Sequence, residues 1–294
     1  MSIKSLKTPL RYPGGKSKAI KTLSQWYPKN ISEYREPFIG GGSIAIDITK
    51  SNPDIPVWIN DLYVPLYNFW VQLRDRGEEL SERVREEKQN TLDEGDPEKI
   101  TAKAKDLFNK YKEEIDTYDD LEKAVAFFVM NKCSFSGLTE NSTFSQTASN
   151  SNFSLVGADK LKEFSKLIQH WKITNLDYSE VINADGSDNT FIFLDPPYDI
   201  KDFLYGKNRE MHKSFDHDLF AENVHKCNHT FMITYNQNHK LMLLYQDYEL
   251  NFWNLRYSMA HRGEKGTDDN MKTELLITNY SINPVTPIEE LLTT

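Results

Sequence analysis

The stretch TFIFLDPPY at residues 190–198 joins five strand-forming residues to a turn that contains two consecutive prolines. Its first five residues are apolar or β-branched without alternation, which predicts a strand buried on both faces. Such strands occur in parallel sheets that carry helices on both sides, and ligands bind there at the carboxyl ends of the strands. The residues after Leu194 are therefore the first candidates for a functional site.

The turn Asp195-Pro196-Pro197-Tyr198 has the chemistry to hold a flat polar ligand. Two prolines fix the backbone and remove two N–H donors, so the carbonyls of this loop can point at a ligand. Asp195 supplies a carboxylate that only accepts hydrogen bonds when ionised, and Tyr198 supplies an aromatic face. These groups suit a planar base with an exocyclic amine. The alternative interpretation is a tight surface turn.

Further strands are predicted on both sides of this stretch, with helical segments between them. The sequence indicates strands at 34–38, 56–61, 172–176, 230–234 and 274–278. Strands that alternate with helices predict an α/β fold with a mostly parallel, doubly wound, Rossmann-like sheet covered on both faces.

A glycine-rich turn, EPFIGGGS at 36–43, follows the first predicted strand. Glycines between a strand and a helix permit positive φ and close approach of the backbone to a ligand. Asp61 ends the next strand about 20 residues later, where a carboxylate usually holds the ribose of an adenosine-containing cofactor. The two features together predict a cofactor site.

The sequence YPGGKS at 12–17 resembles a phosphate-binding loop only in part. The earlier glycine of that motif would fall at Leu10, and no strand precedes it, so we reject a nucleotide-triphosphatase function. We interpret this turn as a second small loop that presents Tyr12 and Lys16 to the cofactor.

Charge is distributed unevenly over the 294 residues, which carry a formal net charge of −9. Residues 1–30 hold seven basic and no acidic residues, whereas residues 75–123 hold 17 acidic and 10 basic ones. Because phosphates respond to the local potential, the overall negative charge does not exclude a nucleic-acid partner. We expect nucleic acid near the basic opening, and we interpret 75–123 as charged, exposed helices.

Residues 131–154 contain 14 Ser, Thr or Asn among 24 residues, together with Phe135, Phe144 and Phe153. A flexible linker and a structured loop or hairpin are both compatible with this composition. Helices are predicted on either side of it, at 119–132 and at about 158–170.

Other classes of protein are disfavoured by composition. Cys133 and Cys227 cannot build a disulfide framework, and the pair His225 and His229 is a weak metal signal, so we predict no metal. No apolar span or secretory leader is evident, and we expect a cytoplasmic protein, of a prokaryotic cell or a virus-infected host, with no membrane partner.

The motifs together resemble the Dam-type DNA adenine-N6 methyltransferases, the α group of amino-methyltransferases. The resemblance covers most of the chain and rests on motifs in this order: aromatic-x-G-G-K at 12–16, E-P-F-x-G-G-G at 36–42, N-D-L at 60–62, F-x-G-L at 135–138, D-P-P-Y at 195–198 and R-x(17)-E-L-L at 256–276. It implies a discontinuous catalytic domain, 1–75 with 171–294, and an inserted, mainly helical target-recognition domain at 76–170.

The resemblance further implies transfer of a methyl group from S-adenosylmethionine to the N6 amine of an adenine flipped out of double-stranded DNA, by a monomer or weak dimer. The catalytic candidates are Asp195, Pro196, Pro197 and Tyr198. The candidates for cofactor binding are Tyr12, Gly14, Gly15, Lys16, Glu36, Pro37, Phe38, Gly40, Gly41, Gly42, Ser43, Asp61, Asp177 and Asp195. The candidates for DNA binding are Lys18, Lys132, Ser134, Phe135, Ser136, Leu138, Thr139, Glu140, Asn141, Arg256 and Arg262.

Two other functions compete with this one: an adenine-N6 methyltransferase acting on RNA, and a DNA-binding protein that keeps the fold without activity. The intact D-P-P-Y and cofactor loops disfavour the second. Glu140 stands where Dam-type enzymes carry a basic residue, and no N-V-P loop follows, so the residues do not predict the usual G-A-T-C target.

Overall fold

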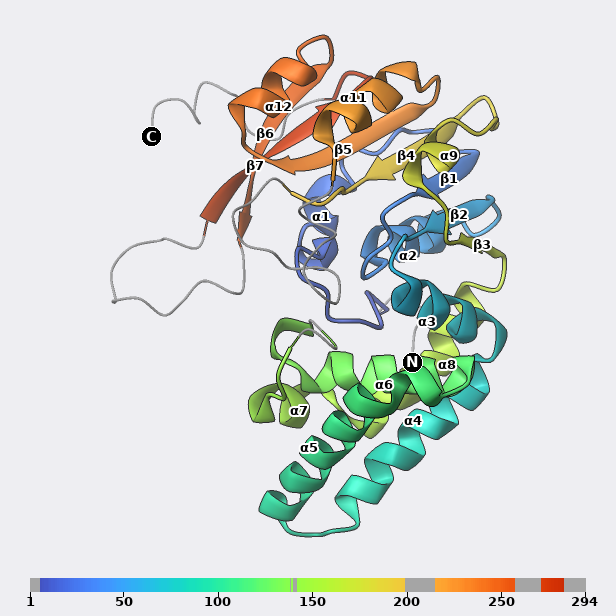
Figure 1. Ribbon diagram of the computed structural model, residues 1–294. Helices are drawn as coiled ribbons and strands as arrows, with labels where there is room; N and C mark the ends of the chain where they lie inside the picture. The colour runs from blue at the N-terminus through green and yellow to red at the C-terminus, as the bar shows by residue number, and fades with distance from the viewer. Residues whose placement is uncertain (1–5, 138, 140–141, 199–214, 257–270, 283–294) are drawn as a thin grey trace.

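The computed structural model describes residues 6–137, 139, 142–198, 215–256 and 271–282. At its centre lies a seven-stranded sheet in the order β3-β2-β1-β4-β5-β7-β6 (Figure 1). The strands are β1 (Glu33–Glu36), β2 (Val57–Asn60), β3 (Trp171–Thr174), β4 (Thr190–Leu194), β5 (Thr230–Asn236), β6 (Glu249–Arg256) and β7 (Met271–Thr278).

The first five strands are parallel, and the last two pair antiparallel with β5 and with each other. The predicted mostly parallel, Rossmann-like sheet is thus confirmed. The strand order reverses between β1 and β4, because the chain proceeds from β1 to β2 and β3 on one side and from β4 to β5 on the other. Ligands bind at such switch points, beyond the carboxyl ends of the strands.

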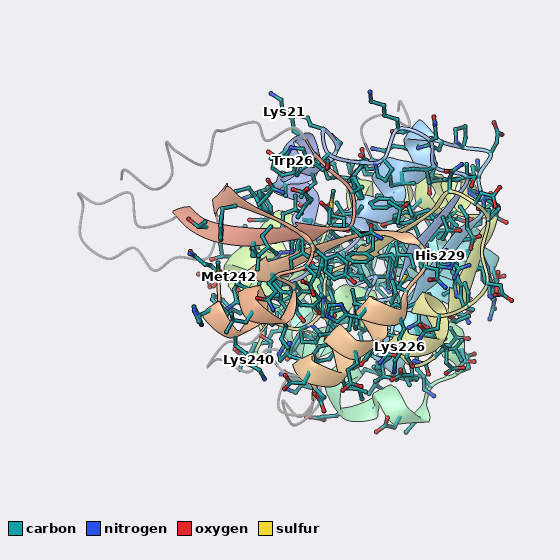
Figure 2. The ribbon with its side chains drawn as sticks, turned by 90° about the horizontal axis from the view of Figure 1, so that it is seen from above. Lys21, Trp26, Lys226, His229, Lys240 and Met242 are labelled. Carbon is teal, nitrogen blue, oxygen red and sulfur yellow. The ribbon has the colours of Figure 1, made fainter. Side chains whose placement is uncertain are left out.

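Both faces of the sheet are buried, as the unbroken apolar run at 190–194 predicts. Phe191 and Phe193 of β4 join one hydrophobic cluster, while Ile192 and Leu194 join a second cluster on the opposite face. In the view from above (Figure 2), Lys21 and Trp26 lie on one side of the sheet, and Lys226 lies on the other. The covering helices are α1 (Ile20–Leu23), α2 (Ser43–Ser51) and α3 (Val64–Asp75) on the first face, and α9 (Tyr178–Ile182), α11 (His217–Lys226) and α12 (His239–Leu244) on the second.

A group of helices lies beneath the sheet in Figure 1, between α3 and β3 in the sequence. Its hydrophobic side chains, among them Leu80 and Phe128, belong to the same cluster as the sheet residues Tyr34 and Phe191. The helical region and the α2/α3 face of the sheet therefore share one core. The helices are α4 (Gly77–Leu92), α5 (Pro97–Glu114), α6 (Asp120–Cys133), α7 (Gln146–Asn152) and α8 (Leu155–Leu167).

The described residues also contain three short 3-10 helices, at Lys16–Lys18 (η2), Ile115–Thr117 (η3) and Phe135–Gly137 (η4). Asp96, Asp119 and Ser154 begin α5, α6 and α8 by accepting backbone N–H bonds with their side chains. Within the described ranges, no helix combines the length and the apolar character needed to cross a membrane.

Two details of the strand arrangement were not predicted from the sequence. The last predicted strand, 274–278, belongs to β7, which runs antiparallel rather than extending the parallel series. Strand β6 was not predicted, because ELNFWNLR intersperses charged and amide residues among its apolar ones. It lies at the edge of the sheet and pairs only with β7, so part of its surface does not need to be apolar.

The start of α2 depends on a close contact between Gly42 and Trp70. Gly42 has φ +69°, and a Cβ added to it would lie 2.6 Å from the Trp70 ring. The Trp70 indole also donates a hydrogen bond to the Gly40 carbonyl at 3.2 Å. The Trp70 indole therefore packs against Gly42 and hydrogen-bonds to Gly40, so it fixes the conformation of the glycine-rich turn.

Substitution Gly42→Ala is expected to lower the free energy of unfolding more than Gly95→Ala. Gly95 has nearly the same φ, +70°, but a Cβ added to it would meet no atom within 4 Å. Both variants carry left-handed strain of about 1–2 kcal/mol. Only Gly42→Ala adds overlap with Trp70, which we expect to cost about 1–3 kcal/mol more. Urea denaturation of both variants measures the difference, and equal losses would contradict the supporting role of Trp70.

Candidate active site

Asp195 lies immediately after β4, at the switch point of the sheet, and its carboxylate is held from two directions. The Lys16 ammonium lies 2.7 Å from both carboxylate oxygens, and the Thr234 hydroxyl donates to Oδ1 at 2.8 Å. The Lys16 side chain is 2% exposed, whereas that of Asp195 is 20% exposed. The carboxylate is thus fixed from within the protein and still open to a ligand.

Tyr198, at the end of the same loop, is fixed by a second pair of contacts. Its hydroxyl donates to Glu274 Oε2 at 3.2 Å, and the Lys16 ammonium lies 5.0 Å from the centre of its ring. Burial, reinforced by the carboxylates of Asp195 and Glu274, raises the pKa of Tyr198 well above its ordinary value. The phenol therefore stays protonated and can donate.

The glycine-rich turn and Asp61 meet at the ends of β1 and β2. The Asp61 carboxylate accepts hydrogen bonds from the backbone N–H groups of Gly40, at 3.2 Å, and Tyr63, at 3.0 Å. Burial raises the pKa of Asp61 to about 6, although these two bonds oppose the shift. Gly40 has φ +47° and packs against the Tyr12 ring, so the two predicted loops are in direct contact.

Asn60 organises this edge of the sheet, and sequence reasoning assigned it no role. Its side-chain amide donates to the carbonyls of Pro37, at 3.1 Å, and Leu176, at 2.9 Å, and its oxygen accepts from Leu176 N–H at 2.8 Å. The loops after β1 and β3 are thereby tied together. Asp177 follows in the second of these loops, is exposed, and begins α9 by accepting from Ser179 N–H.

Other candidates for cofactor binding also lie around the switch point. Glu36 is buried at the end of β1, accepts from the Tyr34 hydroxyl at 2.7 Å and has a pKa raised by burial. Phe38 lies in an aromatic cluster with Tyr178, Phe215 and Phe220. Gly14 and Gly15 are exposed in the loop before Lys16, and Ser43 is buried at the first position of α2.

Residues 6–16, which we call the strap, connect the glycine-rich turn to the helical region. At one end, the Thr8 hydroxyl donates to the Gly41 carbonyl. At the other, the Asn131 side chain accepts from Arg11 N–H at 2.9 Å and donates to the Arg11 carbonyl at 2.7 Å. The same amide donates to the Gly137 carbonyl at 3.0 Å, so Asn131 joins the strap to the predicted DNA-binding segment.

The described part of 131–154 is a structured loop followed by α7. Ser134 and Phe144 form an antiparallel bridge, and Ser134 is completely buried, with its hydroxyl accepting from Thr139 N–H at 3.3 Å. Phe135 is 63% exposed. The composition of this segment thus builds a hydrogen-bonded loop with one aromatic side chain pointing outward.

The basic candidates for DNA binding have different surroundings. Lys18 is exposed. The Lys132 ammonium donates to the Pro9 carbonyl at 2.6 Å and lies over the Phe128 ring, and burial lowers its pKa to about 7. Leu138, Glu140, Asn141 and Arg262 lie outside the described residues, as do the side chains of Ser136 and Arg256.

The side chains of His225 and His229, the weak candidates for metal binding, contact other groups of the protein. The His225 ring nitrogens lie near the Tyr248 hydroxyl, at 3.1 Å, and the Leu244 carbonyl, at 3.0 Å. His229 Nε2 lies 2.9 Å from the Ala184 carbonyl. His225 thus connects α11 to the end of α12 and the residues after it, and His229 connects the start of β5 to the loop before β4.

Comparison with known proteins identifies a matching family and relatives that cover most of the chain. A family model described as D12 class N6 adenine-specific DNA methyltransferase matches residues 12–259. The type II methyltransferase M1.LlaDCHI of Lactococcus lactis subsp. cremoris is 23% identical over 92% of this chain and 94% of its own length. The type II methyltransferase M.MjaIII of Methanocaldococcus jannaschii is 26% identical over 64% of this chain and 68% of its own length. The DNA N-6-adenine-methyltransferase of Escherichia phage P1 is 26% identical over 64% of this chain and 24% of its own length.

Substitution Asn131→Ala is expected to reduce the free energy of unfolding by about 2–3 kcal/mol, because it leaves the partly buried backbone of Arg11 and the buried carbonyl of Gly137 without this partner. The matched control is Asn150→Ala, on the exposed surface of α7. We expect that control to stay within about 0.5 kcal/mol of the wild type. Chemical denaturation distinguishes the two, and an unchanged Asn131→Ala midpoint would refute the link between strap and loop.

Proposed function

Because the chain belongs to the D12 class of N6 adenine-specific DNA methyltransferases, we propose that Asp195, Pro196 and Tyr198 hold the adenine that is methylated. Membership of this class means that DNA is the substrate and implies S-adenosylmethionine as methyl donor. The family resemblance inferred from the sequence motifs is thereby confirmed.

The chemistry of the switch point fits S-adenosylmethionine. Asp61 offers a partly exposed carboxylate to the hydroxyls of a ribose, and the turn at Gly40–Gly42 brings backbone close to the same edge. We propose that Asp61 and the turn bind the cofactor together with Tyr12, Gly14, Gly15, Lys16 and Asp177, and that Glu36, Pro37, Phe38 and Ser43 shape this site. When bound, the cofactor supplies an electrophilic methyl group on its sulfonium.

The adenine amine is a poor nucleophile, because its lone pair is delocalised into the ring. Hydrogen bonds from this amine to the Asp195 carboxylate and the Pro196 carbonyl would favour a more tetrahedral nitrogen with greater nucleophilicity. The observation that carries the proposal is the fixed Asp195 carboxylate, which accepts from Lys16 and Thr234 and remains partly exposed. Positioning and charge complementarity then supply most of the rate.

Tyr198 is proposed to stack on the adenine ring, with Pro197 keeping the loop rigid. The base must leave the DNA duplex to reach Asp195, which costs a few kcal/mol that contacts elsewhere offset. We assign those contacts to the exposed side chains of Lys18, in η2, and Phe135, in η4. The remaining DNA-binding candidates stay predictions.

We further propose that residues 76–170 act as the target-recognition part and that 1–75 with 171–294 act as the catalytic part. The first boundary falls at Arg76, between α3 and α4, and the second falls between α8 and β3. Function as a monomer or weak dimer is part of the same proposal.

Substitution Asp195→Ala is expected to lower methyl transfer to unmethylated duplex DNA by at least about 100-fold, because the amine loses its main acceptor. Transfer is measured with tritiated S-adenosylmethionine. Asp195→Asn, which keeps the shape of the side chain, is tested beside it to separate chemistry from folding. The exposed Asp247→Ala serves as control and should transfer normally. Retained transfer in both Asp195 variants would contradict the mechanism. With the wild type, an RNA transcript of the same sequence should be a poor methyl acceptor compared with duplex DNA.

Affinity for S-adenosylmethionine is expected to rise with pH through about 6, the pKa of Asp61. Only the ionised carboxylate accepts two ribose hydroxyls, so protonation at lower pH weakens binding. Between pH 5 and 7 the dissociation constant should fall roughly tenfold. Asp61→Asn should bind weakly at every pH, whereas the exposed Asp54→Asn should keep the wild-type profile. Isothermal titration calorimetry tests this, and a pH-dependent Asp61→Asn variant would disprove it.

A further inference from the structure

Glu274 is a buried carboxylate whose position in the fold brings it to the candidate active site. Strand β7 runs antiparallel to β5 and places Glu274 opposite Asn236, the last residue of β5. Glu274 therefore lies at the edge of the sheet from which the Asp195 loop emerges. The residue is 1% exposed. Burial of a carboxylate costs free energy unless polar partners compensate the loss of water, so the surroundings of Glu274 need to be identified.

The compensating contacts lead directly to the proposed adenine-binding loop. The Tyr198 hydroxyl donates to Glu274 at 3.2 Å, and the same Tyr198 ring lies beside the Lys16 ammonium that holds Asp195. Thr234, from β5, donates to Asp195 on its other side. The Asp195–Tyr198 turn is therefore attached to both strands: Asp195 contacts β5 through Thr234, and Tyr198 contacts β5 through Tyr235 and β7 through Glu274.

We propose that Glu274 is a positioning residue for methyl transfer: its carboxylate fixes the Tyr198 phenol, so that the ring is held in place for stacking while Lys16 and Thr234 hold Asp195. The inference rests on the proposed roles of Asp195 and Tyr198. The Tyr198 ring packs against Tyr235, with ring centroids 6.0 Å apart, and the Glu274 hydrogen bond holds its hydroxyl end. A misplacement of about 1 Å can cost about 100-fold in rate, so such anchoring has a measurable effect.

The charge on Glu274 gives this role a pH signature. Burial raises its pKa to about 7, with a contribution from Asp195 and opposition from Lys16 and Tyr198. These three groups face it, Glu36 lies beyond Asp195 and interacts with it, and the strand neighbours opposite Glu274 are the uncharged Asn236 and Trp253. The ionised carboxylate accepts the Tyr198 hydrogen bond, whereas the protonated carboxyl accepts it less well. The rate should therefore rise as pH increases through about 7.

The test is the single-turnover rate of methyl transfer from tritiated S-adenosylmethionine to saturating unmethylated plasmid DNA, between pH 6 and 8. We expect the wild-type rate to rise several-fold over this range. Glu274→Gln should lose at least about tenfold at pH 8 and show a flat profile, with the KM for DNA and for cofactor changed less than about twofold. The control is Glu249→Gln, an exposed glutamate on β6, which should keep the wild-type rate and profile.

A double-mutant comparison identifies the partner through which Glu274 acts. Tyr198→Phe removes only the hydroxyl, so it should reproduce the flat profile and the loss seen in Glu274→Gln. Adding Glu274→Gln to Tyr198→Phe should cause no further loss, because the interaction is already absent. Additive losses would overturn the proposal, as would a wild-type profile in Glu274→Gln. Absence of DNA methylation by the wild type would instead refute the proposed function itself.

Discussion

The ion pair between the buried Lys16 and the partly exposed Asp195 joins two parts of the chain that are 179 residues apart. A buried ion pair is stabilising only if further hydrogen bonds compensate the loss of water. Here the Gly14 carbonyl accepts from Lys16 at 3.0 Å, and Thr234 donates to Asp195. The pair fixes the end of the strap against the loop after β4. Because the strap also contacts the glycine-rich turn and the helical region, the relative positions of these parts depend on it.

The sequence predicted the sheet and the main loops because their signals are local. The apolar run at 190–194 coincides with β4 in both bounds. Strand direction is not local, since the antiparallel course of β7 depends on its pairing with β5. Similarly, D-P-P-Y singled out Asp195 and Tyr198, whereas Thr234 was an ordinary strand residue and Glu274 was only part of the R-x(17)-E-L-L motif, with no role of its own. Both residues hydrogen-bond to the loop after β4, and no spacing along the chain reveals such contacts.

Charge counted along the sequence also differs from charge available at the surface. The seven basic residues of the opening segment predict a strong local potential. In the structure Lys16 is neutralised by Asp195, and Arg11 donates to the Ser134 carbonyl at 2.9 Å. Lys7, Lys18, Lys21 and Lys29 remain exposed. The surface therefore offers a weaker and more dispersed attraction for phosphates than the sequence count indicates.

The hydrophobic core shared by the sheet and the helices beneath it limits which segments of this enzyme can be exchanged. Phe69 of α3 packs against Phe127 and Phe128 of α6, and Tyr63, just before α3, also contacts Phe127. The helices between α3 and β3 thus complete the hydrophobic cover of the sheet as well as extending away from it. A chimaera that exchanged residues 76–170 for the corresponding segment of a relative would have to match these aromatic contacts. Under the proposed role of this segment in target recognition, a change at an exposed loop residue such as Phe135 would disturb the shared core less than replacement of the whole segment.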